Sequence, residues 1–445
     1  MGKPRISIPR IFPLFLLFPE IYMTSEEVLY IDGGHRLSGE VVVQGSKNAA
    51  LPMLAASLLA TEGQTVLHRV PPVKDVLVAL EVLRRLGAKV EYDEAREVAV
   101  IDATGVDNTV LPEELTARFR ASVLFLGPLL ARFRQAQLQE VGGCVIGQRP
   151  VDYHYRGFAR LGARVEGMEA GGMLMCAEEL KGAFMYCDLP SHTGVENLIM
   201  AASLARGESL IENAASDPEI VDFAEFLTKM GAKVEGVGTR TVRIVGVDKL
   251  RGAEHTVMYD RLDAGLLMMA GAITQGHVAL KGVRTEHLRV FEAKLQQMGV
   301  EVVEKGEWMQ VKGPEQLSPI NVVTTFYPGF PTDLQPSIMA LACVARGDSY
   351  IRETVFEDRL GHVKNLRAFG AKVSPEKDRL VIVQGVTQLK SAKVKALDIR
   401  AGAACVLAGL AAQGRTSVHH LYQLDRGHVR LEERLAGLGA KVGRI

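Results

Sequence analysis

The sequence is poor in residues that mark several protein classes. Aromatic residues make up 6% of the 445-residue chain, with a single tryptophan. The five cysteines are odd in number and irregularly spaced, which argues against a disulfide framework and favours a reducing compartment. No CxxC or HExxH pattern occurs, so we expect no metal site and no cofactor.

An excess of charge of one sign is also missing. The chain has 52 lysines and arginines against 52 aspartates and glutamates, and its formal net charge is zero. Proteins that coat nucleic acid need a basic surface, so we expect no nucleic-acid partner. A local basic site for a small anion remains compatible with this balance.

Long apolar runs are scarce. The apolar segment at 11–22 is shorter than the about 20 residues that a membrane span requires, and two prolines interrupt it. Basic residues precede it, as in a signal peptide, but no small-residue cleavage site follows cleanly. We therefore interpret residues 1–22 as an extension from an upstream start codon or as a disordered tail, with a targeting role as the alternative. We expect a cytoplasmic protein without a membrane partner.

A sixfold internal repeat is present instead. Leu-Gly-Ala-Lys-Val or a variant of it recurs about every 70 residues, at 86–90, 161–165, 230–234, 298–302, 369–373 and 438–442. Each copy ends an amphipathic stretch, and its glycine suits the position after a helix, where a positive φ is needed. Each copy therefore predicts the end of a helix and the start of a strand.

A second element repeats in phase with the first. Six segments rich in alanine, leucine and methionine lie at 49–60, 121–131, 195–205, 264–274, 334–345 and 401–412. They are apolar on nearly all sides, which predicts fully buried helices. Alternating strand patterns follow them. The sequence therefore predicts an α/β fold of six related units.

Charged residues stand at the starts of these buried helices. Lys47, Arg120 and Arg400 are cations at positions where the helix dipole disfavours positive charge. Asp263 suits ordinary helix capping, and we expect only that role for it. If the helices pack in two bundles of three, their starts face one site. A bound anion with several negative charges would explain the cations there.

A glycine-rich loop interrupts the second unit at 141–152. Its sequence is Val-Gly-Gly-Cys-Val-Ile-Gly-Gln-Arg-Pro-Val-Asp. Glycines permit mobility, and the cation of Arg149 near Cys144 favours a reactive thiolate. The other four cysteines lie in apolar or strand-like settings, and we expect them in the core. Cys144 is therefore the predicted reactive residue.

Five segments carry a resemblance to a known family. They are Gly-Ser-Lys-Asn-Ala-Ala-Leu-Pro at 45–52, Arg-Ala-Ser at 120–122, the loop at 142–152, Phe-Pro-Thr-Asp at 330–333 and Asp-Arg-Gly at 425–427. In this order they closely resemble the UDP-N-acetylglucosamine enolpyruvyl transferase family, from about residue 28 to the C-terminus.

The resemblance implies a fold. It is an inside-out α/β barrel of two domains, each built from three βαβαββ units, with the active site between them. The first domain would be discontinuous, comprising residues 23–46 and 259–445. The second would comprise residues 47–258 and carry the Cys144 loop.

The resemblance also implies an activity, without any cofactor. Such enzymes transfer the enolpyruvyl group of phosphoenolpyruvate to the 3′-hydroxyl of UDP-N-acetylglucosamine and release phosphate, the first committed step of peptidoglycan synthesis. Cys144 matches the proton donor, which fosfomycin alkylates, and Asp333 matches the base. Lys47 is the third catalytic match.

The binding residues follow from the same resemblance. Those that match the phosphoenolpyruvate contacts are Lys47, Asn48, Arg149, Arg359, Arg400 and Arg426. Those that match the nucleotide-sugar contacts are Asn48, Arg120, Arg149, Pro150, Val151, Asp152, Tyr153, Ser191, Asp333 and Val355. The chain departs from the family after Ser191, where His192 is a candidate extra contact to the diphosphate, and after Arg359, where Leu360 replaces a frequent aromatic residue.

Three alternatives remain from the sequence. The 5-enolpyruvylshikimate-3-phosphate synthase family shares the fold and the chemistry but does not need the Gly-Gly-Cys loop. A DNA sliding clamp is also built from repeated units, but it would need a basic inner face. A non-catalytic relative that only binds a UDP-sugar would not need Lys47, Cys144, Asp333 and Arg426 together.

Overall fold

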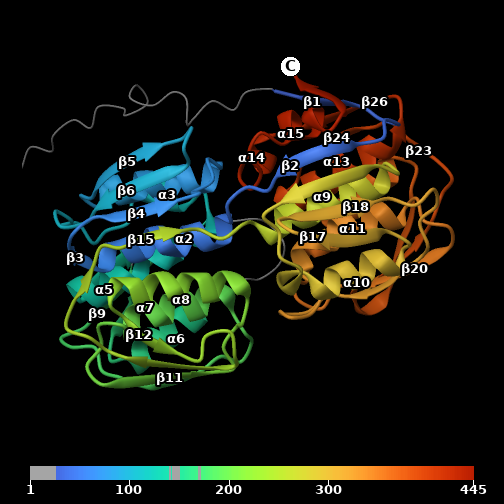
Figure 1. Cartoon of the computed structure of the whole chain (residues 1–445). Coiled ribbons are helices and arrows are strands. Elements are labelled where there is room, and N and C mark those ends of the chain that lie inside the picture. The colour runs from blue at the N-terminus through green and yellow to red at the C-terminus, as the bar shows by residue number, and fades with distance from the viewer. Residues whose placement is uncertain (1–26, 140–141, 143–150, 169–171) are drawn as a thin grey trace, which may run out of the picture.

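Two lobes lie side by side in the computed structural model, which describes residues 27–139, 142, 151–168 and 172–445 (Figure 1). Each lobe has its own hydrophobic core. One core is formed by residues between Ala49 and Val257 with Val429, and the other by residues 29–43 together with 259–440. The N-terminal extension and most of the glycine-rich loop fall outside the described residues.

The first lobe places three buried helices inside a shell of sheets. The central helices are α2 (Lys47–Ala56), α5 (Leu126–Phe133), which continues η3 (Arg120–Phe125), and α7 (His192–Ala202). The others are η2 (Ser57–Leu59), α3 (Lys74–Arg85), α4 (Glu113–Thr116), α6 (Asp152–Arg160) and α8 (Pro218–Met230). Its strands are β3 (Ala60–Glu62), β4 (Thr65–His68), β5 (Lys89–Asp93), β6 (Val98–Asp102), β7 (Gln135–Leu138), β8 (Arg164–Gly167), β9 (Met173–Cys176), β10 (Phe184–Tyr186), β11 (Glu208–Glu212), β12 (Lys233–Glu235), β13 (Thr241–Val245), β14 (Leu250–Arg251) and β15 (Glu254–Thr256).

The second lobe repeats this plan. Its central helices are α9 (Arg261–Ile273), α11 (Gln335–Ala342), which follows η5 (Thr332–Leu334), and α13 (Ile399–Ala411). The others are η4 (Thr285–His287), α10 (Arg289–Gln297), η6 (Arg359–His362), α12 (Val363–Ala368), η7 (Lys377–Arg379), α14 (Tyr422–Asp425) and α15 (Leu431–Gly437). Its strands are β1 (Leu29–Asp32), β2 (Ser38–Val42), β16 (His277–Lys281), β17 (Glu301–Lys305), β18 (Trp308–Lys312), β19 (Asn321–Val323), β20 (Asp348–Arg352), β21 (Lys372–Pro375), β22 (Leu380–Gln384), β23 (Leu389–Lys390), β24 (Lys393–Lys395), β25 (Ala412–Gln413), β26 (Arg415–His419) and β27 (Lys441–Arg444).

Five four-stranded sheets share one topology, a parallel pair followed by two antiparallel pairings. Their orders are β15-β4-β6-β5, β10-β11-β13-β12, β2-β16-β18-β17, β19-β20-β22-β21 and β24-β26-β1-β27. A sixth sheet, β7-β9-β8, is antiparallel. Because β1 and β2 pair with strands from the C-terminal half, the start of the chain completes the second lobe.

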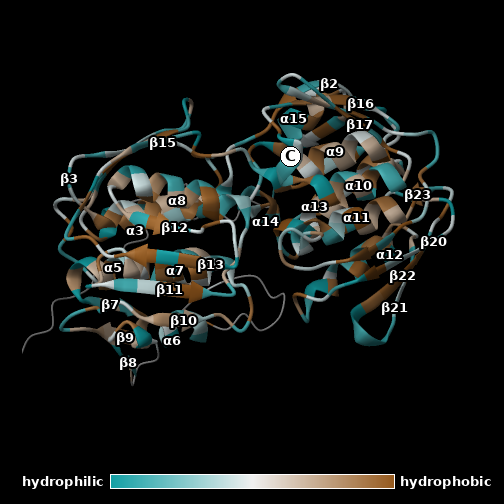
Figure 2. Cartoon of the chain, turned by 60° about the horizontal axis from the view of Figure 1, so that its bottom comes forward, coloured by the Kyte–Doolittle hydropathy of each residue, from teal (hydrophilic) through white to brown (hydrophobic). Residues whose placement is uncertain are grey.

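The central helices are buried on every side, as their sequences predict. All residues of α9 are buried, and α9, α11 and α13 pack against one another. In the first lobe α7 packs against both α2 and α5, and α2 packs against η3, which α5 continues. Long apolar stretches run along the elements inside each lobe (Figure 2). Small residues permit the close approach: a Cβ on Gly271 would lie 2.6 Å from Val278 Cγ2. Burial of these faces from water stabilises both lobes.

The repeated glycines end the outer helices in the predicted way. All six have positive φ: Gly87 (101°), Gly162 (101°), Gly231 (106°), Gly299 (90°), Gly370 (81°) and Gly439 (95°). L-residues with a side chain are strained in this region, whereas glycine is not. The sixfold repeat is therefore a repeat of helix ends as well as of sequence.

The chain passes between the lobes twice, at neighbouring places. Ser46 N donates to Met258 O (2.8 Å), and Asp260 N donates to Gln44 O (2.9 Å). Gly45 lies between them against Arg69, whose carbonyl oxygen would be 1.8 Å from a Cβ at this position. The domain boundaries at 46/47 and 258/259 stay a prediction.

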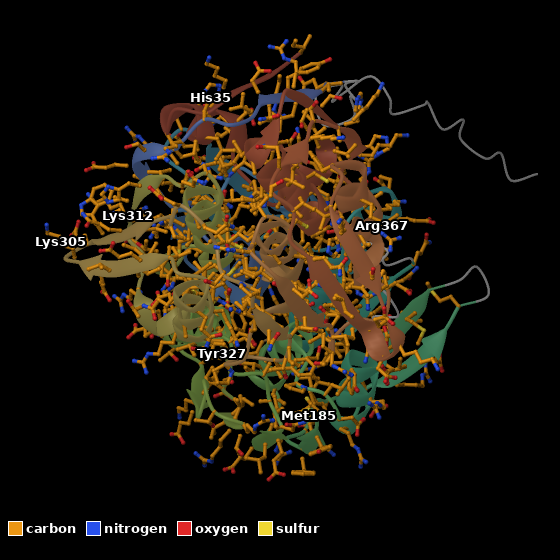
Figure 3. All side chains as sticks on the ribbon, turned by 90° about the vertical axis from the view of Figure 1, so that its right-hand side faces the viewer. His35, Met185, Lys305, Lys312, Tyr327 and Arg367 are labelled. Atoms are coloured by element: carbon orange, nitrogen blue, oxygen red, sulfur yellow. The ribbon has the colours of Figure 1, made fainter. Side chains whose placement is uncertain are left out.

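The surface carries charges of both signs. Nitrogen- and oxygen-tipped side chains project around the whole outline, among them Lys305, Lys312 and Arg367 (Figure 3). In the part of the chain that the structure describes, no helix combines the length and apolar character of a membrane span. The same residues include no group of three or more His, Cys, Asp or Glu side chains suited to a metal ion.

Candidate active site

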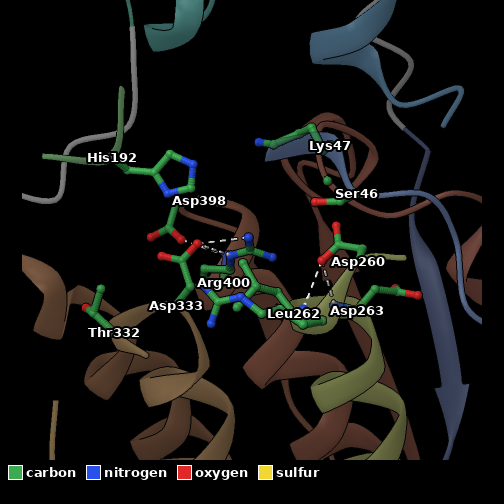
Figure 4. Close-up of polar contacts among 12 residues, drawn as sticks. Ser46, Lys47, His192, Asp260, Leu262, Asp263, Thr332, Asp333, Asp398 and Arg400 are labelled. Carbon is green, nitrogen blue, oxygen red and sulfur yellow. Dashed lines mark hydrogen bonds and ion pairs between the residues drawn. The ribbon is translucent and has the colours of Figure 1, made fainter. Parts of the chain in front are cut away.

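The starts of the buried helices from both lobes meet at one place. Lys47 of α2 and His192 of α7 reach it from the first lobe, and Asp260, Asp333 and Arg400 reach it from the second (Figure 4). Lys47 contributes to lowering the pKa of Asp333, which places these two residues of different lobes in one electrostatic environment. The predicted convergence of the helix starts is therefore observed at these positions.

Polar side chains cap several of these helices. Ser46 Oγ accepts from Ala49 N at 3.3 Å, and Ser191 Oγ accepts from Gly194 N at 3.2 Å. Asp398 Oδ1 accepts from Arg400 N at 2.8 Å. These bonds satisfy backbone donors that a helix leaves free at its N-terminus.

The capping role expected of Asp263 is wrong. Asp260 occupies the N-cap of α9, and its Oδ1 accepts from Leu262 N at 2.9 Å. Asp263 lies within the first turn and is fully buried, where it accepts from Arg434 Nη2 at 2.9 Å and lies 3.1 Å from His428 Nδ1. The sequence shows an acid near a helix start, but only the tertiary structure shows that Arg434 neutralises it.

Asp333 lies between two arginines. Arg359 Nη2 donates to its Oδ1 at 2.7 Å, and Arg400 Nε donates to its Oδ2 at 3.0 Å. The side chains of Arg359 and Arg400 are 3% and 9% exposed, whereas that of Asp333 is 28% exposed. The carboxylate is therefore the most accessible of the three groups. Burial acts to raise the pKa of Asp333, but both guanidinium groups hold it well below its usual range.

Lys47 and Arg426 share a buried carboxylate that no sequence pattern singles out. Lys47 Nζ lies 3.1 Å from Asp75 Oδ2, and Arg426 Nε lies 2.8 Å from Asp75 Oδ1. Asp75 is in the first turn of α3 and only 4% exposed. In sequence it is an ordinary acid near a helix start. Only its burial beside two cations distinguishes it.

Glu353 is a second residue that the sequence did not single out. It is fully buried, and its Oε2 accepts from Thr332 Oγ1 at 3.0 Å. Its Oε1 accepts from the backbone N–H of Val355 at 2.8 Å and of Phe356 at 3.2 Å. Glu353 thus holds the segment that carries Asp333 beside Val355.

The predicted nucleotide-sugar residues come mainly from the first lobe. Asn48 follows Lys47 in α2, Arg120 begins η3, and Asp152 and Tyr153 begin α6. Tyr153 stacks under Arg156, whose Cζ lies 4.8 Å from the ring centroid. Asn48 and Arg120 therefore lie at the starts of central helical segments, and Asp152 and Tyr153 lie at the start of the neighbouring helix α6. Cys144, Arg149 and Pro150 lie outside the described residues, and Val151 directly precedes α6.

His192 is a further cation at a helix start. Its Nε2 lies 3.0 Å from Glu196 Oε1, and its Nδ1 lies 3.9 Å from Asp217 Oδ1. Burial opposes charging of the ring, but attraction from Glu196 and Asp217 raises the pKa of His192 to about 10. The raised pKa favours the imidazolium form of His192, whose ring points towards Asp398 and Asp333 in Figure 4.

Comparisons with known proteins define the class. A family model described as EPSP synthase (3-phosphoshikimate 1-carboxyvinyltransferase) matches residues 31–435. The enolpyruvyl transferase NikO from Streptomyces tendae superimposes with a TM-score of 0.86 at 26% identity, covering 94% of this chain and 99% of that one. EPSP synthase from Acinetobacter baumannii, at 19% identity, shares the fold with a TM-score of 0.73 and coverage of 94% and 100%. The predicted inside-out α/β barrel, with three units in each half, is confirmed as the enolpyruvyl transferase fold.

Relatives by sequence are more specific. UDP-N-acetylglucosamine 1-carboxyvinyltransferase of Thermobifida fusca is 49% identical over 426 residues, covering 94% of this chain and 99% of the relative. The corresponding enzyme 1 of Staphylococcus epidermidis is 46% identical, with the same coverage, and enzyme 1 of Halalkalibacterium halodurans is 47% identical, covering 94% of each chain. The chain therefore belongs to the EPSP synthase family, and within it to the UDP-N-acetylglucosamine 1-carboxyvinyltransferases.

Proposed function

We propose that this protein transfers the enolpyruvyl group of phosphoenolpyruvate to the 3′-hydroxyl of UDP-N-acetylglucosamine and releases phosphate. In a peptidoglycan-building cell this is the first committed step of that pathway, in the cytoplasm. The observation that carries the proposal is the arrangement of Asp333 between Arg359 and Arg400, with Lys47 of the other lobe nearby. A carboxylate that can accept a proton stands there among cations that suit a small, highly charged anion.

The two ends of phosphoenolpyruvate have separate partners in this proposal. Lys47 and Arg426, which share Asp75, bind the phosphate together with Arg149. Arg359 and Arg400 bind the carboxylate with help from Arg426. Guanidinium groups suit both anions because their N–H donors form a planar fork. Asn48 follows Lys47 in α2 and completes the set at the phosphate end.

Asp333 acts as the base only when its arginines have another partner. Both guanidinium groups lower the pKa of Asp333 and make it a weak base. We propose that the carboxylate of phosphoenolpyruvate takes over bonds from Arg359 and Arg400. The proton affinity of Asp333 then rises, because attraction from these cations is shared with a second anion. Binding of one substrate thereby prepares the residue that activates the other.

The proposed reaction is an addition followed by an elimination. Cys144 donates a proton to C3 of phosphoenolpyruvate, the 3′-oxygen bonds to C2, and the hydroxyl proton passes to Asp333. The thiolate that Cys144 became in the first step then takes a proton back from C3, and the double bond re-forms as the C2–O bond to phosphate breaks. General acid–base groups of this kind contribute roughly 10² to 10⁴ each to the rate.

The nucleotide sugar lies between the lobes in this proposal. Arg120, Asp152, Tyr153 and Ser191 contact it from the first lobe, as do Arg149, Pro150 and Val151, while Val355 contacts it from the second. His192 directly follows Ser191 at the start of α7 and is a further contact to the diphosphate in this proposal. Movement of the 47–258 domain against the remainder closes the site and excludes water.

A second candidate acceptor is shikimate 3-phosphate, because the matching family model is described by that reaction. The test is phosphate release from phosphoenolpyruvate by the purified chain with either acceptor. We expect release with UDP-N-acetylglucosamine and none above background with shikimate 3-phosphate. The reverse pattern would assign the chain to the second reaction, and no release with either would favour a non-catalytic binding protein.

A further inference from the structure

The phosphate end of the site contains a buried anion as well as two cations. Asp75 is 4% exposed, and its carboxylate is bonded on both oxygens: Lys47 Nζ lies 3.1 Å from Oδ2 and Arg426 Nε lies 2.8 Å from Oδ1. Arg426 Nη2 also donates to Oδ2 at 3.4 Å. One carboxylate therefore contacts both cationic groups.

The trio joins the two lobes. Lys47 begins α2 and Asp75 lies in the first turn of α3, both in the first lobe, whereas Arg426 follows α14 in the second. Gln423 supports the arrangement, since its Oε1 accepts from Arg426 Nη1 at 3.0 Å. The bonds to Asp75 thus link the two cations to one carboxylate and connect Arg426 to the first lobe.

Asp75 is held in its charged form. The N-terminus of α3 favours an anion in its first turn. Burial alone would raise the pKa of Asp75, but attraction from Lys47 and Arg426 keeps it below the usual value. With two positive charges and one negative charge, the trio keeps a net positive charge of one. It therefore still attracts phosphate, while the repulsion between two buried cations is offset.

We propose that Asp75 is the positioning residue of the phosphate end, holding Lys47 and Arg426 at the spacing that a phosphate group requires. This inference rests on the proposed function for the identity of the phosphate donor. Asp75 acts through its two partners, since it is buried behind them. The opposite possibility is that Asp75 occupies the cations as a competitor that the phosphate must displace.

The two possibilities predict opposite results for Asp75→Asn, which keeps the shape and removes the charge. If Asp75 positions the cations, KM for phosphoenolpyruvate rises at least about tenfold, while KM for UDP-N-acetylglucosamine changes less than about twofold. Asp75→Glu, which restores the charge, recovers part of the loss. If Asp75 is a competitor, KM for phosphoenolpyruvate falls. An unchanged KM in the folded variant would also overturn the proposal.

A matched control separates positioning from stability. Glu219 of α8 is fully buried and bonds Arg261 of α9 across the lobes, with Nε and Oε1 2.9 Å apart. Glu219→Gln removes a similar buried inter-lobe carboxylate away from Lys47 and Arg426. We expect it to lower the melting temperature without the selective change in KM for phosphoenolpyruvate. If Asp75→Asn and Glu219→Gln each raised KM for phosphoenolpyruvate and KM for UDP-N-acetylglucosamine by the same factor, the role of Asp75 would be only structural.

Binding of inorganic phosphate tests the inference without turnover. By calorimetry, Asp75→Asn should bind phosphate at least about tenfold more weakly than the wild-type protein, and Glu219→Gln should bind it normally. That result would support positioning even if the acceptor were misassigned, whereas equal phosphate binding by Asp75→Asn and wild type would refute it. If Asp75→Asn does not fold, Asp75→Glu serves in the same assays. We expect it to bind phosphoenolpyruvate and phosphate more weakly and UDP-N-acetylglucosamine normally. Normal binding of all three would contradict the proposal. Failure of the proposed function is recognised separately, by a wild-type protein that releases no phosphate.

Discussion

Arg400 places both Nε and Nη2 against one oxygen of Asp333, at 3.0 Å and 2.9 Å from Oδ2. Arg400 stands in the first turn of α13, where the helix dipole disfavours a cation, and Asp333 compensates for this. The protein itself therefore supplies an anion that explains a cation at this helix start. A substrate carboxylate must compete with it for the same donors.

The first prediction concerns Asp333 as the base. Asp333→Asn keeps the shape but removes the proton acceptor, so kcat should fall at least about a hundredfold while UDP-N-acetylglucosamine still binds. Steady-state kinetics and calorimetry measure the two effects. Asp32→Asn is the control, because Asp32 also pairs with an arginine, with Arg415 Nη2 at 2.8 Å, and has no role in the proposed site. Near-normal kcat for Asp333→Asn would remove this residue from the mechanism.

The second prediction concerns the phosphate end. Lys47→Ala and Arg426→Ala should each raise KM for phosphoenolpyruvate at least about tenfold, a loss of about 1.4 kcal/mol, because each removes a charge-assisted contact. Arg426→Ala should destabilise the fold more, since Arg426 gives Asp75 two contacts and Lys47 gives one. Kinetics and thermal unfolding measure these effects. A large loss of stability with normal kinetics would make the two cations purely structural.

The third prediction concerns Cys144. An epoxide that carries a phosphonate, such as fosfomycin, should label this cysteine, faster when UDP-N-acetylglucosamine is present. Burial raises the pKa of Cys187 to about 11 and that of Cys343 and Cys405 to about 12, so these thiols should be unreactive. Intact-protein mass spectrometry with peptide mapping identifies the site.

Variants of the same residue sharpen the experiment. Cys144→Ala should abolish labelling and sharply reduce turnover. Cys144→Asp should retain activity because a carboxylic acid also donates a proton, and it should escape the epoxide. A label on Cys176 or on a buried cysteine, or no label with the nucleotide sugar present, would count against Cys144 as the reacting residue.

The fourth prediction concerns the pH dependence of stability. Burial, with repulsion from Glu304, raises the pKa of Glu292 to about 7, and among the described residues its buried Oε1 has no hydrogen-bond partner. A carboxyl whose pKa is higher in the folded state destabilises the fold when ionised. That penalty is present above pH 7 and is relieved as the pH falls through 7 towards 4.5.

Glu292→Gln removes this charge. It should raise the free energy of unfolding at pH 8 by on the order of 1 kcal/mol, a value reduced by partial solvent screening, and change it little at pH 4.5. Thermal unfolding at both pH values measures the difference. Glu301→Gln is the control, because the side chain of Glu301 is 65% exposed. An equal gain at both pH values would show that ionisation of Glu292 is not the cause.

Periodicity in the sequence was sufficient to predict most of the architecture. An all-round apolar segment such as 264–274 has no stable place except the interior, and α9 is indeed buried throughout. Gly231 marks a helix end because the φ of 106° there strongly favours glycine. These are local consequences of side-chain chemistry, and each repeats in all six units.

Only the tertiary structure decided how the charges combine. The sequence itself determined that Lys47, Arg400 and Asp333 stand at helix starts, because capping, dipole and apolar patterns are local. It did not determine that Asp75 neutralises Lys47, since 28 residues separate them, or that Arg426, 351 residues from Asp75, completes the trio. Packing of α2 beside α3 and of the two lobes against each other brings these groups within hydrogen-bonding distance. Because these groups are buried, each charge is unfavourable without its partner, and no local sequence pattern indicates which partner that is.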